Sequence, residues 1–135
     1  MNDCIFCKIV KGDIPCYKIY EDNDVLAFLD IANDVYGHTL VVPKAHCVNL
    51  LDANEQILAK VMAAVRKVAN HYVNNCGFDG VNTFNCNGKG AEQSVFHLHI
   101  HVIPRKDNDG ISIWKNKTNG TQSLQEVCDK LKLSN

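Results

Sequence analysis

The stretch His97-Leu98-His99-Ile100-His101-Val102-Ile103 alternates histidines with large apolar residues. Strict alternation is typical of a β-strand that buries one face, because successive side chains point to opposite sides. We therefore expect Leu98, Ile100 and Val102 to enter a core, and the three imidazoles to line the other face about 6.6 Å apart. Pro104 cannot donate to a strand ladder, so the strand is expected to end there.

Three imidazoles on one strand face can support two kinds of chemistry. Imidazole is a common zinc ligand, but residues spread over about 13 Å of strand cannot all reach one ion. At most one or two of them would bind, with ligands from elsewhere. Neutral imidazole is also a nucleophile near pH 7. The preceding loop, Gln93-Ser94-Val95, offers N–H groups and a hydroxyl to phosphate oxygens, which favours phosphorus as the target.

The composition is that of one globular domain spanning residues 1–135. The net charge of −1 gives no sign of a nucleic-acid or membrane surface, and no apolar run approaches membrane-spanning length. The N-terminus lacks the pattern of a signal peptide. We expect a cytoplasmic protein, with the nucleus as a further compartment. Seven cysteines, an odd number, favour free thiols or metal ligands over a disulfide framework.

The predicted elements form an α+β domain with a mostly antiparallel five-stranded sheet and one long helix. Asp52, with Glu55 three residues later, is the expected start of that helix, and Asn74-Asn75-Cys76-Gly77 its end. A short helix is expected at each end of the chain, the second of them after Ser123. The expected ranges are a helix over 4–11 and strands over 17–21, 25–30, 38–42, 81–86 and 95–103.

The histidine row and several upstream segments together resemble the histidine-triad (HIT) family. Residues 93–103 closely match its signature, in which three histidines alternate with apolar residues. Residues 4–10, 28–31 and 37–46 are similar to further segments of the family, in the expected order. The resemblance covers roughly residues 4–105. It implies the HIT fold, with a sheet that continues across a homodimer.

The resemblance also implies a function, that of nucleotidyl hydrolases and transferases. His99 would attack the α-phosphate and form a covalent nucleotidyl-histidine intermediate, which water then cleaves. His101 would lie by the phosphate and leaving group, Ser94 would help protonate that group, and Asp30 would bind the ribose hydroxyls. No catalytic metal is required. The implied purine and phosphate contacts are Ile5, Phe6, Ile9, Phe28, Ile31, Leu40, Gln93 and Val95.

A structural zinc site is a further implication. Cys4 and Cys7 are spaced to share one helix face, and C-x2-C alone is a modest metal signal. In some HIT proteins such a pair joins two histidines, which correspond here to His46 and His97. Four such ligands make a complete tetrahedral zinc site, and zinc would then remove His97 from the chemistry. The alternative is two free thiols and two hydrogen-bonded histidines.

The sequence departs from the family pattern at two places. Glu92 stands where many members have glycine, and Cys86 falls where many have asparagine, so that either neighbour, Asn85 or Asn87, would have to contact the phosphate region. The expected activity is that of the nucleoside phosphoramidase (Hint-like) branch: cleavage of adenosine 5'-phosphoramidates or similar purine nucleotide conjugates to AMP. The alternatives are dinucleoside polyphosphate (Fhit-like) hydrolysis and a non-catalytic nucleotide-binding interaction protein.

Overall fold

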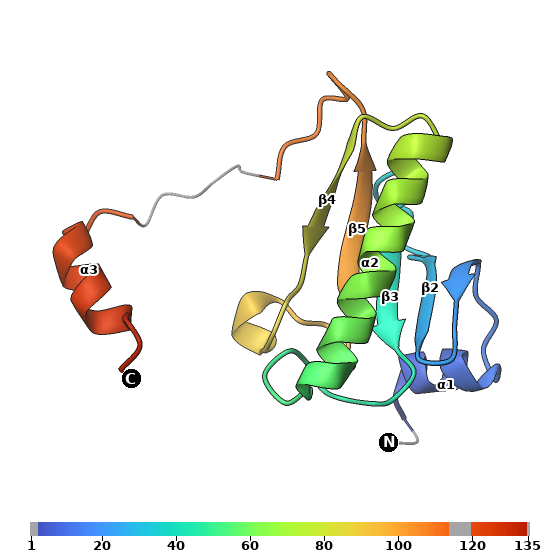
Figure 1. Cartoon of the computed structure of the whole chain (residues 1–135), viewed down its shortest axis with the longest axis horizontal. Coiled ribbons are helices and arrows are strands. Elements are labelled where there is room, and N and C mark those ends of the chain that lie inside the picture. Colours follow the sequence, from blue (N-terminus) through green and yellow to red (C-terminus); the bar gives the residue numbers. More distant parts are fainter. Residues whose placement is uncertain (1–2, 114–119, 135) are drawn as a thin grey trace.

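The computed structural model describes residues 3–113 and 120–134 as an α+β fold with a five-stranded antiparallel sheet. The strand order is β1-β2-β3-β5-β4, so β3 and β5 lie side by side near the middle and β4 forms one edge (Figure 1). This architecture confirms the predicted fold class. The elements are α1 (Ile5–Lys11), β1 (Lys18–Glu21), β2 (Val25–Leu29), β3 (Thr39–Pro43), α2 (Glu55–Asn75), β4 (Gly80–Phe84), the 3₁₀ turn η1 (Lys89–Ala91), β5 (Ile100–Arg105) and α3 (Leu124–Leu131).

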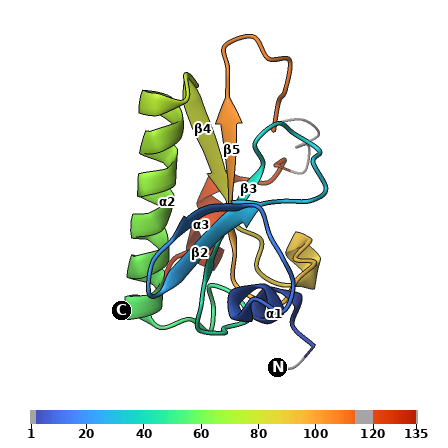
Figure 2. The ribbon, with the colours of Figure 1, turned by 90° about the vertical axis from the view of Figure 1, so that its right-hand side faces the viewer.

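The long helix α2 covers one face of the sheet (Figures 1 and 2). Its apolar residues recur at helical spacing and pack on alternate residues of β2, β3 and β5, as the periodicity predicts. Leu98, Ile100 and Val102 all lie in this core, which confirms the predicted inward face of the histidine row. The other members of the core are Val25, Ala27, Val41, Cys47, Val61, Ala64, Val65, Val68 and Tyr72.

The start of α2 corrects one prediction. Asn54, not Asp52, caps the helix, and its side chain accepts the N–H of Ile57 at 2.8 Å. The carboxylate of Asp52 instead accepts the N–H groups of Val48 and Asn49 in the preceding loop. Asp52 and Asn54 can both cap a helix, and they stand two positions apart in the sequence. Asp52 is already bonded to the turn that begins at Val48, so Asn54 caps the helix.

A smaller apolar core on the opposite face lies beneath α1. Phe6 packs edge-on against Phe28, at a centroid distance of 5.5 Å, and belongs to the same buried group as Leu26, Leu40 and Val42. Gly12 ends α1 in the left-handed region, at φ 87°, as expected for a helix-terminating glycine. The helix is therefore held over the ends of β2 and β3, next to the histidine row.

Strand β5 differs from its prediction at both ends. It begins at Ile100, not near residue 95, and it runs through Pro104 to Arg105. Pairing with β3 stops at Val102, whereas pairing with β4 continues past Pro104, which lies opposite Val81. The missing N–H of Pro104 therefore falls beyond the reach of β3 and disturbs no central ladder.

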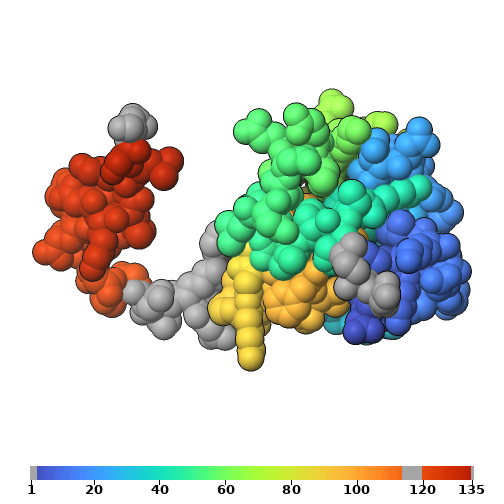
Figure 3. All heavy atoms as spheres, turned by 90° about the horizontal axis from the view of Figure 1, so that it is seen from below, coloured from blue at the N-terminus to red at the C-terminus, as the bar shows by residue number. Residues whose placement is uncertain are grey.

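The C-terminal helix α3, predicted after Ser123, is present but buries none of its residues. It stands apart from the body that residues 3–113 form (Figures 1 and 3). The sheet, α1 and α2 are therefore complete without it. Among the described residues, no helix is both long and apolar enough to cross a membrane.

Candidate functional site

Two cavities meet at the histidine row. The first, of about 260 Å³, lies beneath α1 and has mostly apolar walls. The second, of about 530 Å³, lies toward β4 and the η1 turn. Ser94, His99 and His101 line both cavities. A molecule bound at these three residues can therefore extend into an apolar cavity on one side and a more polar one on the other.

The apolar cavity collects most of the residues predicted to hold a purine nucleotide. Asp30, at the end of β2, places a carboxylate in the wall of this cavity. Ile14, Pro15 and Leu29 also line it, although a turn and a strand end carry no periodic signal in the sequence that would predict a cavity wall. The predicted residues that it includes are Ile5, Phe6, Ile9, Phe28, Asp30, Ile31, Leu40, Ser94, Val95, His99 and His101.

His99 is buried, and its tautomer is fixed by the backbone. Its Nδ1 lies 2.7 Å from the carbonyl oxygen of His97. Because a carbonyl only accepts, Nδ1 carries the proton and Nε2 keeps its lone pair. Burial lowers the pKa of His99, which favours the neutral ring. Phe6 packs edge-on against this ring at 5.2 Å. The side chain is thus a neutral, oriented imidazole at the junction of the two cavities.

His101 lies at the end of a chain of hydrogen bonds for which the sequence carries no signal. His38 Nε2 lies 2.8 Å from His101 Nδ1, and His38 Nδ1 lies 2.6 Å from Asp34 Oδ1. The Asp34 carboxylate only accepts, so it fixes the His38 proton on Nδ1. Asp30 Oδ2 is 3.7 Å from His38 Nε2. Burial and the neighbouring imidazoles lower the pKa of His101 to about 4.

Phe84 of β4 stacks on the face of the His101 ring, nearly parallel to it and at a centroid distance of 4.4 Å. The stacking fixes the plane of the His101 ring, and the bond from Nδ1 to His38 fixes its rotation within that plane. In the sequence, His38 lies on the predicted strand 38–42 and within the family-like segment 37–46, and Phe84 lies on the predicted strand 81–86. Neither position predicts a contact with His101.

The loop before β5 is organised by the buried side chain of Gln93. Its amide donates to the carbonyls of Val48 and Val95, and its oxygen accepts from Gly88 N–H and the Asn49 side chain. With these bonds made, the Gln93 side chain faces the protein interior. These bonds fix the backbone of the loop and thereby position the next residue, Ser94.

The two predicted asparagine contacts also point into the protein. Asn85 donates to the carbonyl of His99 at 2.8 Å, and Asn87 donates to Asn85 and accepts the N–H of Leu50. Neither lines the two cavities, whereas Cys86 between them lines the second one. The asparagines therefore hold the segment that carries His99, and the departure from the family pattern at Cys86 faces the cavity itself.

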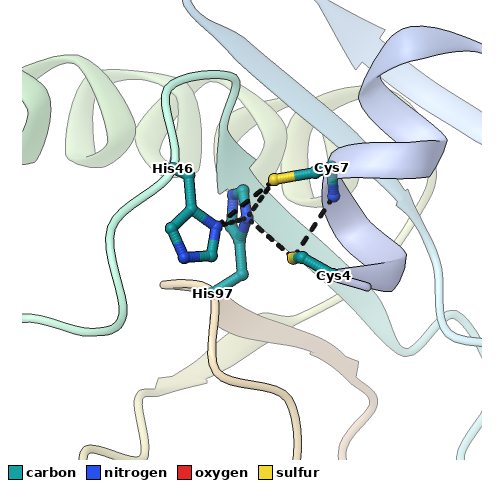
Figure 4. A group of neighbouring side chains, drawn as sticks. All are labelled: Cys4, Cys7, His46 and His97. Atoms are coloured by element: carbon teal, nitrogen blue, oxygen red, sulfur yellow. Dashed lines mark hydrogen bonds between the residues drawn. The ribbon is translucent and has the colours of Figure 1, made fainter. Parts of the chain in front are cut away.

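A second cluster brings together Cys4, Cys7, His46 and His97, the four residues predicted to bind zinc (Figure 4). Their ligand atoms lie within 4.8 Å of one another. His97 Nε2 donates to the carbonyl of Pro43 at 2.8 Å, which leaves its Nδ1 unprotonated and directed at both thiols and at His46 Nδ1. Two sulfurs and two imidazole nitrogens are a complete donor set for tetrahedral zinc.

Comparison with known proteins agrees with this geometry. The family model described as the HIT domain matches residues 11–108. A relative from Schizosaccharomyces pombe, named adenosine 5'-monophosphoramidase hnt1, is 42% identical over 106 residues, which cover 78% of this chain and 77% of the relative.

Two solved structures are similar along nearly the whole chain. The crystal structure of a HIT family member from Bacillus subtilis has a TM-score of 0.81 at 42% identity, and the match covers 98% of this chain and 99% of that one. A zinc-bound histidine-triad protein from Mycobacterium smegmatis has a TM-score of 0.79 at 40% identity, covering 86% of this chain and 84% of that one.

Proposed function

Because the chain belongs to the HIT family, we propose that it hydrolyses purine nucleotide conjugates of the adenosine 5'-phosphoramidate type and releases AMP. In the first step, His99 Nε2 forms a bond to the α-phosphorus as the phosphorus–nitrogen bond to the leaving amine breaks, and that amine takes up a proton that the Ser94 hydroxyl relays from solvent. In the second step, water attacks the nucleotidyl-histidine, giving AMP and free His99. No metal takes part in either step.

The observation that carries the proposal is the state of His99. A nucleophilic imidazole needs one nitrogen with a free lone pair and a ring that is neutral near pH 7. The bond from Nδ1 to the His97 carbonyl supplies the first condition, and burial supplies the second by lowering the pKa. The attacking nitrogen sits where the two cavities meet, so the nucleotide and its leaving group have separate places.

Ser94 and His101 are the groups that we assign to the phosphate and leaving group. Ser94 offers a hydroxyl beside His99 and is positioned by the bonds of Gln93. His101 keeps Nε2 available when its Nδ1 bonds to His38. A preorganised donor such as the Ser94 hydroxyl stabilises the charge that develops on the phosphoryl oxygens and costs little reorganisation.

The apolar cavity is the proposed base and ribose site. Phe6, Phe28 and Leu40 offer apolar surface to a planar purine, and Asp30 offers carboxylate oxygens to ribose hydroxyls. One Asp30 oxygen already accepts the N–H of Ala32, which fixes the carboxylate at the end of β2. This combination supports an apolar, planar base with a hydroxyl-bearing sugar.

We assign zinc to Cys4, Cys7, His46 and His97. Bound there, zinc would serve structure and not catalysis, since its ligands would join α1 and the segment after β3 to the row itself. The Nδ1 of His97 is free to bind because Nε2 is committed to Pro43. This division leaves His99 and His101 for the substrate.

We also propose a homodimer in which the sheet continues across two copies. β4 is an edge strand of the sheet and contacts α2, and Met62 and Val73 are exposed apolar residues of α2. Sedimentation equilibrium measures the mass directly. A single species of one-chain mass at micromolar concentration contradicts the dimer.

The activity is tested by incubating the protein with AMP-morpholidate and measuring AMP. Wild type is expected to release AMP, and His99→Ala to fall by at least about a thousandfold, because the nucleophile is gone. His71→Ala is the matched control, since His71 lies exposed on α2. Equal AMP release by wild type and His99→Ala contradicts the mechanism. A competing diadenosine polyphosphate, compared by kcat/KM, separates the two hydrolase types.

A further inference from the structure

The second cavity, which we call the leaving-group cavity, differs in chemistry from the nucleotide side. It is lined by Asp34, His38, Phe84, Cys86, Glu92, Ser94, His99, His101 and Ile113. A substrate whose base fills the apolar cavity and whose α-phosphorus lies at His99 must place its leaving group here. We propose that Glu92 makes this cavity select leaving groups that carry positive charge, an inference that rests on the proposed function.

The charges of the cavity wall support this selection. Asp34 and Glu92 contribute two carboxylates, and no lysine or arginine of the described residues 3–113 and 120–134 lines the cavity. His38 directs its Nδ1 proton at Asp34 and His99 directs its own at the His97 carbonyl, so neither of these N–H groups is available to an anionic ligand. Burial also lowers the pKa of His101 to about 4, which keeps that ring neutral at pH 7. A cationic group gains from this field, whereas an anionic one is repelled.

Glu92 is the freer of the two carboxylates. Asp34 already accepts a hydrogen bond from His38. Within the part of the chain that the structure describes, the Glu92 carboxylate forms no hydrogen bond or ion pair with another residue. Lys89, three residues earlier in the η1 turn, lies outside the cavity wall. The Glu92 carboxylate is therefore available to a ligand.

The backbone at Glu92 is also unusual for a glutamate. Glu92 has φ 67° and ψ 27°, in the left-handed region, and its N–H bonds to the carbonyl of Lys89. Side chains with a Cβ adopt this region at an energetic cost, and glycine adopts it freely. The chain thus places a glutamate in the cavity wall at a position where the backbone conformation disfavours any residue with a Cβ. Backbone strain of this kind is typical of functional sites.

The remaining wall indicates the shape of the leaving group. Phe84 and Ile113 are apolar, and Phe84 lies flat against His101 beside the reacting centre. Methylene groups next to the scissile bond would pack there, and a terminal ammonium would reach the carboxylates. The class that fits is the phosphoramidate of an alkyl amine with a second, protonated amine.

Three matched substrates test the selection: adenosine 5'-phosphoramidates of cadaverine, of N-acetylcadaverine and of ε-aminocaproate, whose distal groups are cationic, neutral and anionic. Wild type is expected to rank them in that order by kcat/KM. Glu92→Gln is expected to lower kcat/KM for the cationic substrate about threefold, raise it about threefold for the anionic one and leave the neutral one unchanged, as an exposed ion pair allows. Added salt is expected to compress the wild-type ranking.

Glu126→Gln is the matched control, because it removes the same charge from α3 and is expected to leave all three values unchanged. Glu92→Lys provides a second reading, since it should reverse the ranking. An equal effect of Glu92→Gln on all three substrates overturns the inference while AMP release stands. Failure of wild type to release AMP from any of them, above the His99→Ala background, overturns the proposed function, and the inference with it.

Discussion

Asp34 is expected to act on the reaction through His38, although it is not expected to touch the phosphate or the base. Its carboxylate accepts the Nδ1 proton of His38 at 2.6 Å, and His38 Nε2 in turn faces His101 Nδ1 at 2.8 Å. Asn keeps an oxygen acceptor at this position but loses the charge, whereas Leu loses both. The pair Asp34→Asn and Asp34→Leu therefore separates the effect of the charge from the effect of the fixed tautomer.

The expected magnitudes follow from exposure. A hydrogen bond to a charged group contributes roughly 1.5–3 kcal/mol when buried, but the Asp34 side chain is 57% exposed, so solvent screening reduces this to about 1 kcal/mol or less. Asp34→Asn is then expected to lower kcat/KM about two- to fivefold. Asp34→Leu is expected to lower it by a further factor of about ten, because His38 can then bind a water or rotate and His101 loses its fixed partner.

The assay is kcat/KM from pH 5 to 8 with AMP-morpholidate, whose leaving group does not test the charge selectivity of the cavity. Thermal stability gives a second reading. The hydrogen bond from His38 lowers the pKa of Asp34, so its stabilisation is present above the unfolded pKa of about 4 and is lost as pH falls through the folded value. If Asp34→Leu has the same kcat/KM as wild type from pH 5 to 8, the positioning role of Asp34 is refuted.

Three further predictions concern metal, core and backbone. The double variant Cys4→Ser, Cys7→Ser is expected to lose the bound zinc measured by elemental analysis, and undiminished zinc would remove these ligands from the proposal. Leu98→Ala should lower the unfolding free energy in denaturant by about 2–4 kcal/mol, because Leu98 is 1% exposed, whereas Leu124→Ala, at a residue 84% exposed, should change it by less than about 0.5 kcal/mol; equal effects would contradict the core assignment. Glu92→Gly should raise Tm by about 2–4 °C by relieving the left-handed backbone, and an unchanged or lower Tm would argue against strain there.

The core face of the histidine row could be predicted because it depends only on alternation. Leu98, Ile100 and Val102 enter the α2 core even though regular pairing in β5 begins at Ile100. The extended backbone alone sets which side each residue faces. The place of Pro104, by contrast, depended on where β3 stops pairing, and only the sheet order supplies that information.

In the candidate site, too, the residues close in sequence could be predicted, whereas the contacts that depend on strand pairing could not. The Cys4–Cys7 pair carries a spacing signal, and resemblance supplied the partners His46 and His97. The contacts of His38 with Asp34 and His101 have no such signal, because a 63-residue separation between the two histidines is bridged only when β3 pairs with β5. Nor does spacing reveal that Glu92 adopts a positive φ, which follows from how η1 closes.

We propose different functions for the three histidines because the structure gives their rings different hydrogen-bond partners. His97 donates to Pro43 from Nε2 and directs Nδ1 at the two thiols. His99 donates from Nδ1 to the His97 carbonyl and keeps Nε2 for attack. The backbone oxygen of His97, a proposed zinc ligand, thus orients His99, the proposed nucleophile, so a shift of His97 is expected to move His99 as well. Loss of zinc should therefore reduce the rate of nucleotidyl transfer more than it weakens AMP binding, although zinc touches neither the phosphate nor the base.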